Sequence, residues 1–392
     1  RKQRADLIGT QEGLHHQLLY MDKELENHKW IGVGREGGKK GEFMAIFYRT
    51  NRFKPLEIKH FWLSDTPETV GSASWGNSVK RMVTWVRFLD QKTNKEFYFW
   101  DLNGYLVLPG VMDEAWLAEA NEAIDKFEDQ IVVGEELARG SKSLAGTGRP
   151  LLRGLLELPD PYHKPFRRMI ANPAVEHRLN WMGASGGRCG GPTAFCSVLG
   201  GSGHSLHSNN EPLYPPMGYV FQNGRSYDQA VTVAFQLRDV EPGLGGFACV
   251  PGTHKAFYPM PDGIRTCDDG MGLVVQPVMK AGDVLFFGDG ATTHGATAWK
   301  NPIPRRGLLI KYTSRNFHRS GGEMVQPENR WGGLVEDMTD AQIAVMRGPD
   351  RDVGVNNVPR LDVKDGEVSV SYERGRTLYS QEAPTGPVAK LK

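Results

Sequence analysis

The segment at residues 282–312 constrains the fold of this chain more than any other. Its sequence, GDVLFFGDGATTHGATAWKNPIPRRGLLIKY, contains two short apolar runs, at 284–287 and 307–310. Short apolar runs bounded by glycines and polar residues are typical of buried β-strands. His294 lies between the two runs, and Arg305 comes at the start of the second. We therefore predict a buried sheet that holds these two side chains on a rigid support.

His294 and Arg305 carry side chains that suit a metal ion and a carboxylate. A neutral imidazole is the commonest protein ligand of a metal, although a single histidine can equally be an ordinary surface residue with satisfied hydrogen bonds. The guanidinium of Arg305 begins inside a predicted strand, where a charge is costly unless it is paired. Its planar fork of donors fits a carboxylate. Together the two residues indicate a metal site beside an anion site.

A second metal ligand is expected in the segment GGSGHSLHSNNEPLYPP at 200–216, which contains His204, His207, Asn209 and Glu211. Iron(II) oxygenases with open coordination positions use two histidines and one carboxylate. Residues i and i+2 of an extended segment point to the same side. His207 and Asn209 have this spacing, with an amide in place of the acid. The third ligand is therefore Asn209, Glu211, or a water or anion at an empty protein position.

His204 is the alternative to His207. It precedes His207 by three residues, so the two would face opposite sides of a regular strand, whereas in a turn both could reach the metal. We favour His207 because it has the spacing to residue 209.

Residues 101–318 resemble the phytanoyl-CoA dioxygenase-like branch of the iron(II)/2-oxoglutarate oxygenases. The matching features occur in the family's order: GYLVLPG at 104–110, His207, GGFACVPGTHK at 245–255, GD at 282–283, His294 and Arg305. The resemblance implies a double-stranded β-helix, a cupin-like jelly roll with the metal at its mouth. It also implies Fe(II) on His207 and His294.

The same resemblance implies that Arg305 binds the distal carboxylate of 2-oxoglutarate, with Arg306 as the substitute if the register is shifted by one residue. Trp299 would line the cofactor pocket, or else pack beneath its loop. The implied reaction hydroxylates a small organic substrate and releases succinate and CO2. The missing acid at Asn209 leaves two other outcomes, halogenation or a non-catalytic ligand-binding jelly roll with a degenerate metal site.

The first hundred residues resemble a different group, the endonuclease/exonuclease/phosphatase superfamily. The resemblance rests on IGTQEGLHHQ, GVGREGGKKGEFMAIFY, FWLSDTPETVGSASWG and RMVTWVRFLDQKTNKEFYFW. It implies a divalent-metal ligand at Glu12, with Mg(II) as the ion. The later strands that would carry the catalytic histidine and the other acids are missing, so hydrolysis has no mechanism. We expect an incomplete fragment with a vestigial site; the alternative is a Mg-dependent phosphoesterase or nuclease-derived protein.

We predict a mainly β protein with flanking helices: an incomplete α/β-sandwich fragment at 1–100, a jelly roll at 101–325, and a C-terminal extension packed on the jelly roll at 326–392. Apolar periodicity predicts helices at 14–25, 113–133 and 339–347. Short apolar runs predict further strands at 43–48, 84–89, 97–100, 193–199 and 230–237. The polar, glycine-containing stretch at 134–154 is either a mobile loop over the mouth or a plain surface connection.

Composition excludes several partners. The 47 Lys and Arg balance 46 Asp and Glu, and the net charge of +1 gives no reason to expect nucleic acid or an anionic membrane. The four cysteines have no CxxC spacing and indicate thiols in a reducing compartment. No apolar run approaches the roughly 20 residues that span a bilayer. We expect a cytoplasmic enzyme with a small-molecule substrate; the sequence does not indicate an oligomeric state.

Overall fold

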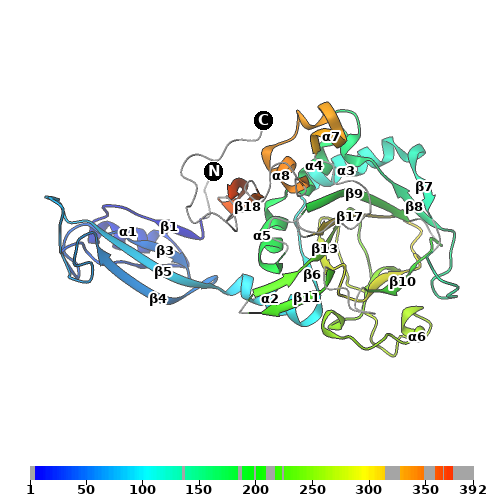
Figure 1. Ribbon diagram of the computed structural model, residues 1–392, viewed down its shortest axis with the longest axis horizontal. Helices are drawn as coiled ribbons and strands as arrows, with labels where there is room; N and C mark the ends of the chain where they lie inside the picture. Colours follow the sequence, from blue (N-terminus) through cyan, green and yellow to red (C-terminus); the bar gives the residue numbers. More distant parts are fainter. Residues whose placement is uncertain are drawn as a thin grey trace, which may run out of the picture. The chain divides into compact units, whose positions relative to one another are not determined.

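The computed structural model of the chain describes residues 5–134, 137–183, 188–197, 200–208, 217–222, 225–313, 327–347, 358–364 and 366–373. It divides into two compact units, Arg1–Tyr98 and Phe99–Lys392 (Figure 1). Among the described residues, no helix is both long enough and apolar enough to cross a bilayer.

The N-terminal unit contains a small antiparallel sheet and a separate long hairpin. The sheet has the strand order β1-β3-β2, from β1 (Leu7–Gly9), β2 (His28–Ile31) and β3 (Ile46–Arg49). The hairpin pairs β4 (Phe53–Trp62) with β5 (Met82–Asp90). Helix α1 (His15–Glu24) confirms the predicted first helix. Its Leu18 is buried in one cluster with Phe43 and Phe47.

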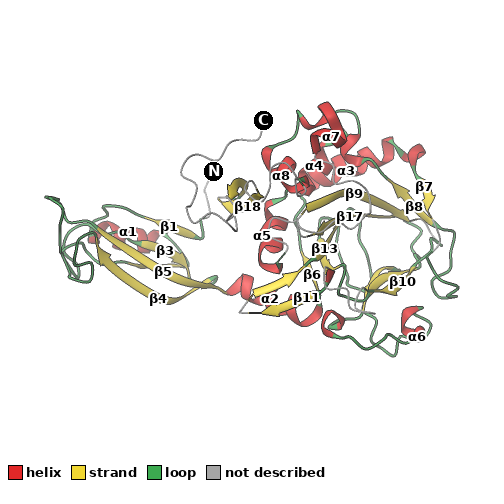
Figure 2. Ribbon diagram, viewed as in Figure 1, coloured by secondary structure: helices red, strands yellow, loops and turns green. Residues whose placement is uncertain are grey.

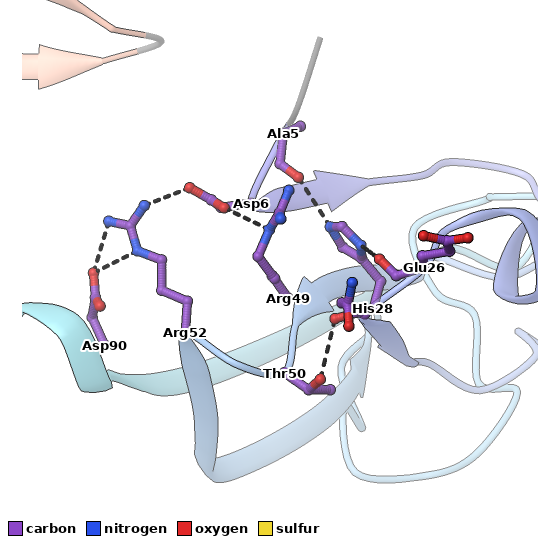
Figure 3. Close-up of polar contacts among 9 residues, drawn as sticks. Ala5, Asp6, Glu26, His28, Arg49, Thr50, Arg52 and Asp90 are labelled. Carbon is purple, nitrogen blue, oxygen red and sulfur yellow. Dashed lines mark hydrogen bonds and ion pairs between the residues drawn. The ribbon is translucent and has the colours of Figure 1, made fainter. Parts of the chain in front are cut away.

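Ion pairs connect the ends of these strands (Figure 3). Asp6, just before β1, forms an ion pair with Arg49 (2.8 Å) and accepts a hydrogen bond from Arg52. Arg52 also donates to Asp90 at the end of β5 (2.9 Å). The side chains are 21–34% exposed, so each pair contributes only modestly to stability, but together they connect the ends of β1, β3, β4 and β5.

The C-terminal unit is built on two antiparallel sheets (Figure 2). The larger has the order β6-β15-β13-β17-β9-β8-β7, from β6 (Tyr105–Leu108), β7 (Val132–Gly134), β8 (Arg149–Leu152), β9 (Arg188–Ser197), β13 (Ala230–Gln236), β15 (Val284–Gly288) and β17 (Arg305–Thr313). The smaller has the order β10-β16-β14, from β10 (His204–His207), β14 (Gly246–Cys249) and β16 (His294–Thr297). A separate hairpin pairs β11 (Tyr219–Gln222) with β12 (Arg225–Asp228).

Helices cover one face of the larger sheet (Figure 2). They are α3 (Glu114–Lys126), α4 (Lys164–Ile170), α5 (Pro173–Met182) and α8 (Asp340–Met346). Their buried side chains form a single core with alternate residues of β13, β15 and β17, for example Trp116, Phe166, Val345, Val233 and Ile310. The hairpin of β18 (Val358–Lys364) and β19 (Glu367–Glu373) adds Leu361 to this core. The remaining helices are α2 (Gln91–Asn103), α6 (Asp262–Arg265) and α7 (Pro327–Trp331).

Strand β17 shows how the sheet separates this core from the other face. Leu308, Ile310 and Tyr312 are fully buried in the helix-side core. Arg305, Leu309 and Lys311 alternate with them and line a cavity on the opposite face. Because side chains alternate along a strand, the apolar Leu308, Ile310 and Tyr312 share the helix-side face. The cations Arg305 and Lys311 share the cavity face.

Two predicted elements are wrong. The helix predicted at 113–133 ends at Lys126 and is followed by a 3-10 turn and by β7, since the β-branched pair Val132 and Val133 joins the edge of the sheet beside β8. The strand predicted at 97–100 lies inside α2, which ends before Gly104 with φ of +75°. A glycine in this conformation commonly ends a helix. The predicted strands at 193–199 and 230–237 and the helix at 339–347 are confirmed as β9, β13 and α8.

Candidate active site

A cavity of about 240 Å³ lies between the two sheets of the C-terminal unit. Its polar lining comes from both sheets: Arg149, His204, His207, Asp289, His294, Arg305 and Lys311. Its apolar lining includes Leu137, Phe247, Phe287, Trp299 and Leu309. Leu137 belongs to the stretch at 134–154, so part of that connection does border the cavity. A concave, largely apolar site with a few convergent charges is the usual form of a small-molecule site.

Two histidines face each other across the smaller sheet. β10 and β16 are antiparallel, and their register places His207 opposite His294. The ring centroids of these residues are 4.5 Å apart. His204 lies beside them, with its ring centroid 4.3 Å from that of His207. The register shifts between His204 and His207, and such a bulge lets both rings line one cavity despite their odd spacing.

The backbone sets the orientation of both rings. Nδ1 of His207 lies 3.0 Å from the carbonyl oxygen of Ser205, and Nδ1 of His294 lies 2.7 Å from that of Thr292. A carbonyl only accepts, so Nδ1 carries the proton in each ring and Nε2 carries the lone pair. Metal-binding histidines are usually held in this way.

Burial keeps the imidazoles of His204 and His294 neutral. Desolvation, and then the proximity of His207, holds the pKa of His294 well below its usual range. Burial, followed by His207 and Arg149, lowers the pKa of His204 to about 2. A neutral ring with an available lone pair is the form that binds a metal ion.

Arg305 presents a buried cation to the cavity. Its Nε is buried and has no hydrogen-bond partner among the described residues. A Cβ at Gly246 would lie 3.4 Å from this Nε, and one at Gly307 would lie 3.6 Å from Nη2. Burial, and then Arg149, lowers the pKa of Arg305 to about 10, so it stays protonated at neutral pH. The two glycines therefore leave room around a charged group that lacks an anion.

Arg306 lies on the opposite face of β17. It donates to Asn121 Oδ1 (2.9 Å) and to the carboxylate of Asp125, both on α3. It does not line the cavity. Strand alternation separates the two arginines, so we leave Arg306 out of the site that we propose.

Three charged residues of the cavity lining were not predicted from the sequence: Arg149, Asp289 and Lys311. Asp289 follows β15 directly, and its Oδ1 lies 3.7 Å from His294 Nε2 and 2.8 Å from Lys311 Nζ. Burial, and then Arg149, lowers the pKa of Lys311 to about 8. Lys311 could have been predicted, because it follows Arg305 by six residues on the same strand face. Arg149 and Asp289 had no comparable signal, since one begins a short strand next to the edge of the sheet and the other lies in a turn.

The other predicted site residues have varied placements. Trp299 lines the cavity, and its Nε1 donates to the carbonyl of Ile303 (2.9 Å). Asn209 and Glu211 lie outside the described residues. Glu12 belongs to the N-terminal unit, where its exposed carboxylate accepts a hydrogen bond from Arg81 (3.0 Å). Nothing in the described part of that unit surrounds Glu12 with further metal ligands.

The model of the phytanoyl-CoA dioxygenase (PhyH) family matches residues 100–307, which is just over half of the 392-residue chain. The chain belongs to this family. It is thus a non-haem iron, 2-oxoglutarate-dependent dioxygenase, with Fe(II) and 2-oxoglutarate as the cofactor and co-substrate of its class. The matched residues contain the two antiparallel sheets apart from most of β17, and among the described residues the sheets form the predicted jelly roll without closing into a barrel.

Solved structures to which the chain is similar include HygX and SnoN. HygX from Streptomyces hygroscopicus, solved with nickel and 2-oxoglutarate bound, is 18% identical, with a TM-score of 0.48; the match covers 61% of this chain and 93% of HygX. SnoN, a non-haem α-ketoglutarate-dependent epimerase from nogalamycin biosynthesis, is 21% identical, with a TM-score of 0.43; the match covers 57% of this chain and 84% of SnoN. No curated protein matches the chain.

A third solved structure matches a smaller part of the present chain. The endonuclease/exonuclease/phosphatase from Bacteroides vulgatus is 37% identical over 22% of this chain, with a TM-score of 0.22. This chain covers only 34% of that protein.

The cavity fits the cofactor and co-substrate of the family. The imidazoles of His207 and His294, whose Nδ1 atoms contact backbone carbonyls, turn Nε2 to the cavity, and the buried guanidinium of Arg305 has an Nε without a partner among the described residues. As the side chains stand, the described residues contain no group of three or more His, Cys, Asp or Glu that could hold a metal ion. The described residues thus supply the histidine pair without a third protein ligand already in contact with it.

Proposed function

We propose that this dioxygenase binds Fe(II) through His207 and His294, binds 2-oxoglutarate through Arg305, and hydroxylates a small organic substrate with release of succinate and CO2. One observation carries the proposal: the two histidines are paired across β10 and β16 and share a cavity with a buried, unsatisfied arginine. The combination supports a metal and a dicarboxylate side by side.

Each residue has a distinct role in this proposal. The bound iron would supply the redox chemistry that couples decarboxylation of 2-oxoglutarate to oxidation of the substrate. His207 and His294 would hold the ion through Nε2, in orientations fixed by their Nδ1 hydrogen bonds. Arg305 would bind the distal carboxylate as a charge-assisted pair. Phe247, Phe287 and Leu309 would exclude water from the reacting groups.

We also propose a role for each of the three parts of the chain. Residues 101–325 would form the catalytic jelly roll, and residues 326–392 would support it through α8 and Leu361. The N-terminal 1–100 would take no part in catalysis, since Glu12 pairs with Arg81 at an exposed position. Neither part calls for nucleic acid as a partner.

The test begins with anaerobic titration of Fe(II) and 2-oxoglutarate, followed by succinate measurement after oxygen is admitted. We expect succinate from the unaltered protein, even without substrate, through slow uncoupled turnover. His207→Ala, His294→Ala and Arg305→Met should each abolish it. His16→Ala changes an exposed histidine of the N-terminal unit and is the matched control.

Two results would overturn the proposal. One is the absence of succinate under all conditions, with metal binding unaffected by His294→Ala, which is the behaviour of a ligand-binding jelly roll. The other is Mg(II)-dependent phosphatase or nuclease activity that Glu12→Ala abolishes. A chlorinated product formed in the presence of chloride would replace hydroxylation by halogenation.

A further inference from the structure

The proposed metal site lacks an acid at the position where the sequence pattern puts one. Non-haem iron sites with open positions usually combine two histidines with one carboxylate, and residue 209 is asparagine. Among the described residues that line the cavity, Asp289 is the only carboxylate. It comes from the turn after β15, between His207 and His294 in the sequence.

The position of Asp289 suits a metal ligand. Its side chain is 2% exposed, and its backbone N–H donates to the carbonyl of Ala230 (2.9 Å), which fixes the start of the turn. Its Oδ1 lies 3.7 Å from His294 Nε2, the nitrogen that carries the lone pair. Two ligands at right angles on one ion, each at about 2.0–2.2 Å, are roughly 3 Å apart. A small rotation of the carboxylate brings it into that range.

A cation already lies against this carboxylate. The ammonium of Lys311 is 2.8 Å from Asp289 Oδ1. A buried carboxylate is costly without a positive partner, and Lys311 supplies one. A divalent ion beside His294 would attract the same oxygen more strongly than a single ammonium charge does.

We propose that Asp289 supplies the carboxylate of the metal site in place of residue 209, and that Lys311 neutralises Asp289 when no metal is bound. The proposal rests on the proposed function, because it needs His207 and His294 as the other ligands. It deepens that function by relocating the third ligand from the loop after β10 to the turn after β15.

The test measures binding of the metal alone. Fe(II) under anaerobic conditions, and Co(II) as an oxygen-stable probe, are titrated by calorimetry without 2-oxoglutarate, and the Co(II) absorption bands report its coordination. Asp289→Asn keeps the size of the side chain and should weaken binding by at least about tenfold. Asp289→Glu, which retains the carboxylate, should recover part of the loss. Lys311→Met should strengthen binding, because it removes the competing cation.

The chain offers a matched control in a second aspartate–lysine pair. Asp239 accepts a hydrogen bond from Lys280 (2.8 Å), with side chains 46% and 63% exposed and outside the cavity. Asp239→Asn should leave the metal affinity unchanged. Thermal unfolding of all variants checks that lost binding does not come from lost folding.

The outcomes separate this inference from the proposed function. If His207→Ala and His294→Ala weaken metal binding but Asp289→Asn does not, the relocated carboxylate is wrong and the function stands. If Asn209→Ala weakens binding at least as much as Asp289→Asn, residue 209 remains the ligand and the inference is overturned. If neither histidine variant affects binding, the proposed function fails first.

Discussion

The adjacent arginines of strand β17 lie on its two opposite faces and differ in their bonding partners. On the helix face, Arg306 is bonded to Asn121 and Asp125 among apolar neighbours that belong to the main core. On the cavity face, Arg305 has no ion pair among the described residues, and the buried Nε that both arginines leave unbonded is here the atom beside the cavity. Arg306 stabilises the fold through its contacts with α3, whereas the burial of Arg305 lowers stability and leaves a cation beside the cavity. Buried charge without a partner is costly, so the cavity face indicates selection for a ligand.

The largest expected effect falls on the cavity face. Arg305→Met should reduce the affinity for 2-oxoglutarate by more than a hundredfold, or about 3–5 kcal/mol, because it removes the partner of a desolvated carboxylate. Anaerobic calorimetry with Fe(II) bound measures the loss. Thermal stability should be unchanged or higher, since an unsatisfied charge is removed. Retained affinity for 2-oxoglutarate would mean that another cation, such as Arg149, binds the co-substrate.

The next effect belongs to the helix face. Leu308→Ala should lower the free energy of unfolding by about 2–4 kcal/mol, since Leu308 is fully buried in the helix-side core. Urea denaturation measures it. Its neighbour Leu309 lines the cavity, so Leu309→Ala should cost less stability and change ligand binding more. Equal effects of the two substitutions on both quantities would contradict the division between the faces.

Arg306→Met sharpens the contrast between the arginines. It should lower the free energy of unfolding by about 1–2 kcal/mol through the lost hydrogen bonds to α3. The loss stays moderate because the side chain of Asp125 is 61% exposed and remains solvated. The affinity for 2-oxoglutarate should be unaffected. A loss of that affinity comparable with Arg305→Met would show that the register on β17 is shifted by one residue.

The smallest effect is expected at the end of the same strand. The hydroxyl of Tyr312 donates to the carbonyl of Ile170 at the end of α4 (2.9 Å). Tyr312→Phe should lower the free energy of unfolding by about 1 kcal/mol, the usual net value of one hydrogen bond. Urea denaturation and succinate formation, measured together, should report a stability change without a change in turnover. A drop in turnover would connect this face to the site.

Much of the fold was predictable, for reasons that differ between segments. The buried strands β13 and β15 are dense apolar runs, and α8 begins at Thr339 with a capping box, so local sequence determines them. The end of α3 was not predictable, because Phe127 and Ile131 continue the helical apolar pattern while packing from a turn beside β7. Periodicity alone does not distinguish these cases.

The site divides in the same way. His294 and Arg305 follow from their places between and within two apolar runs, and their roles in a metal and anion site came from the family resemblance. The bulge that brings His204 and His207 to one cavity has no signal in GHSLHS, since neither glycine nor proline lies between the histidines. Asp289 approaches His294 only because the turn after β15 is anchored to β13, which is a tertiary effect.

The hydrogen bonds from Nδ1 of His207 and His294 go to carbonyls only two residues earlier in the same chain segment. Each of these two contacts therefore orients its ring from within its own strand segment. A pair of short strands with this backbone geometry would be sufficient to carry the imidazoles into an unrelated sheet. The histidine half of this site is thus suited to grafting in protein engineering, whereas the arginine half needs the glycines of two different sheets.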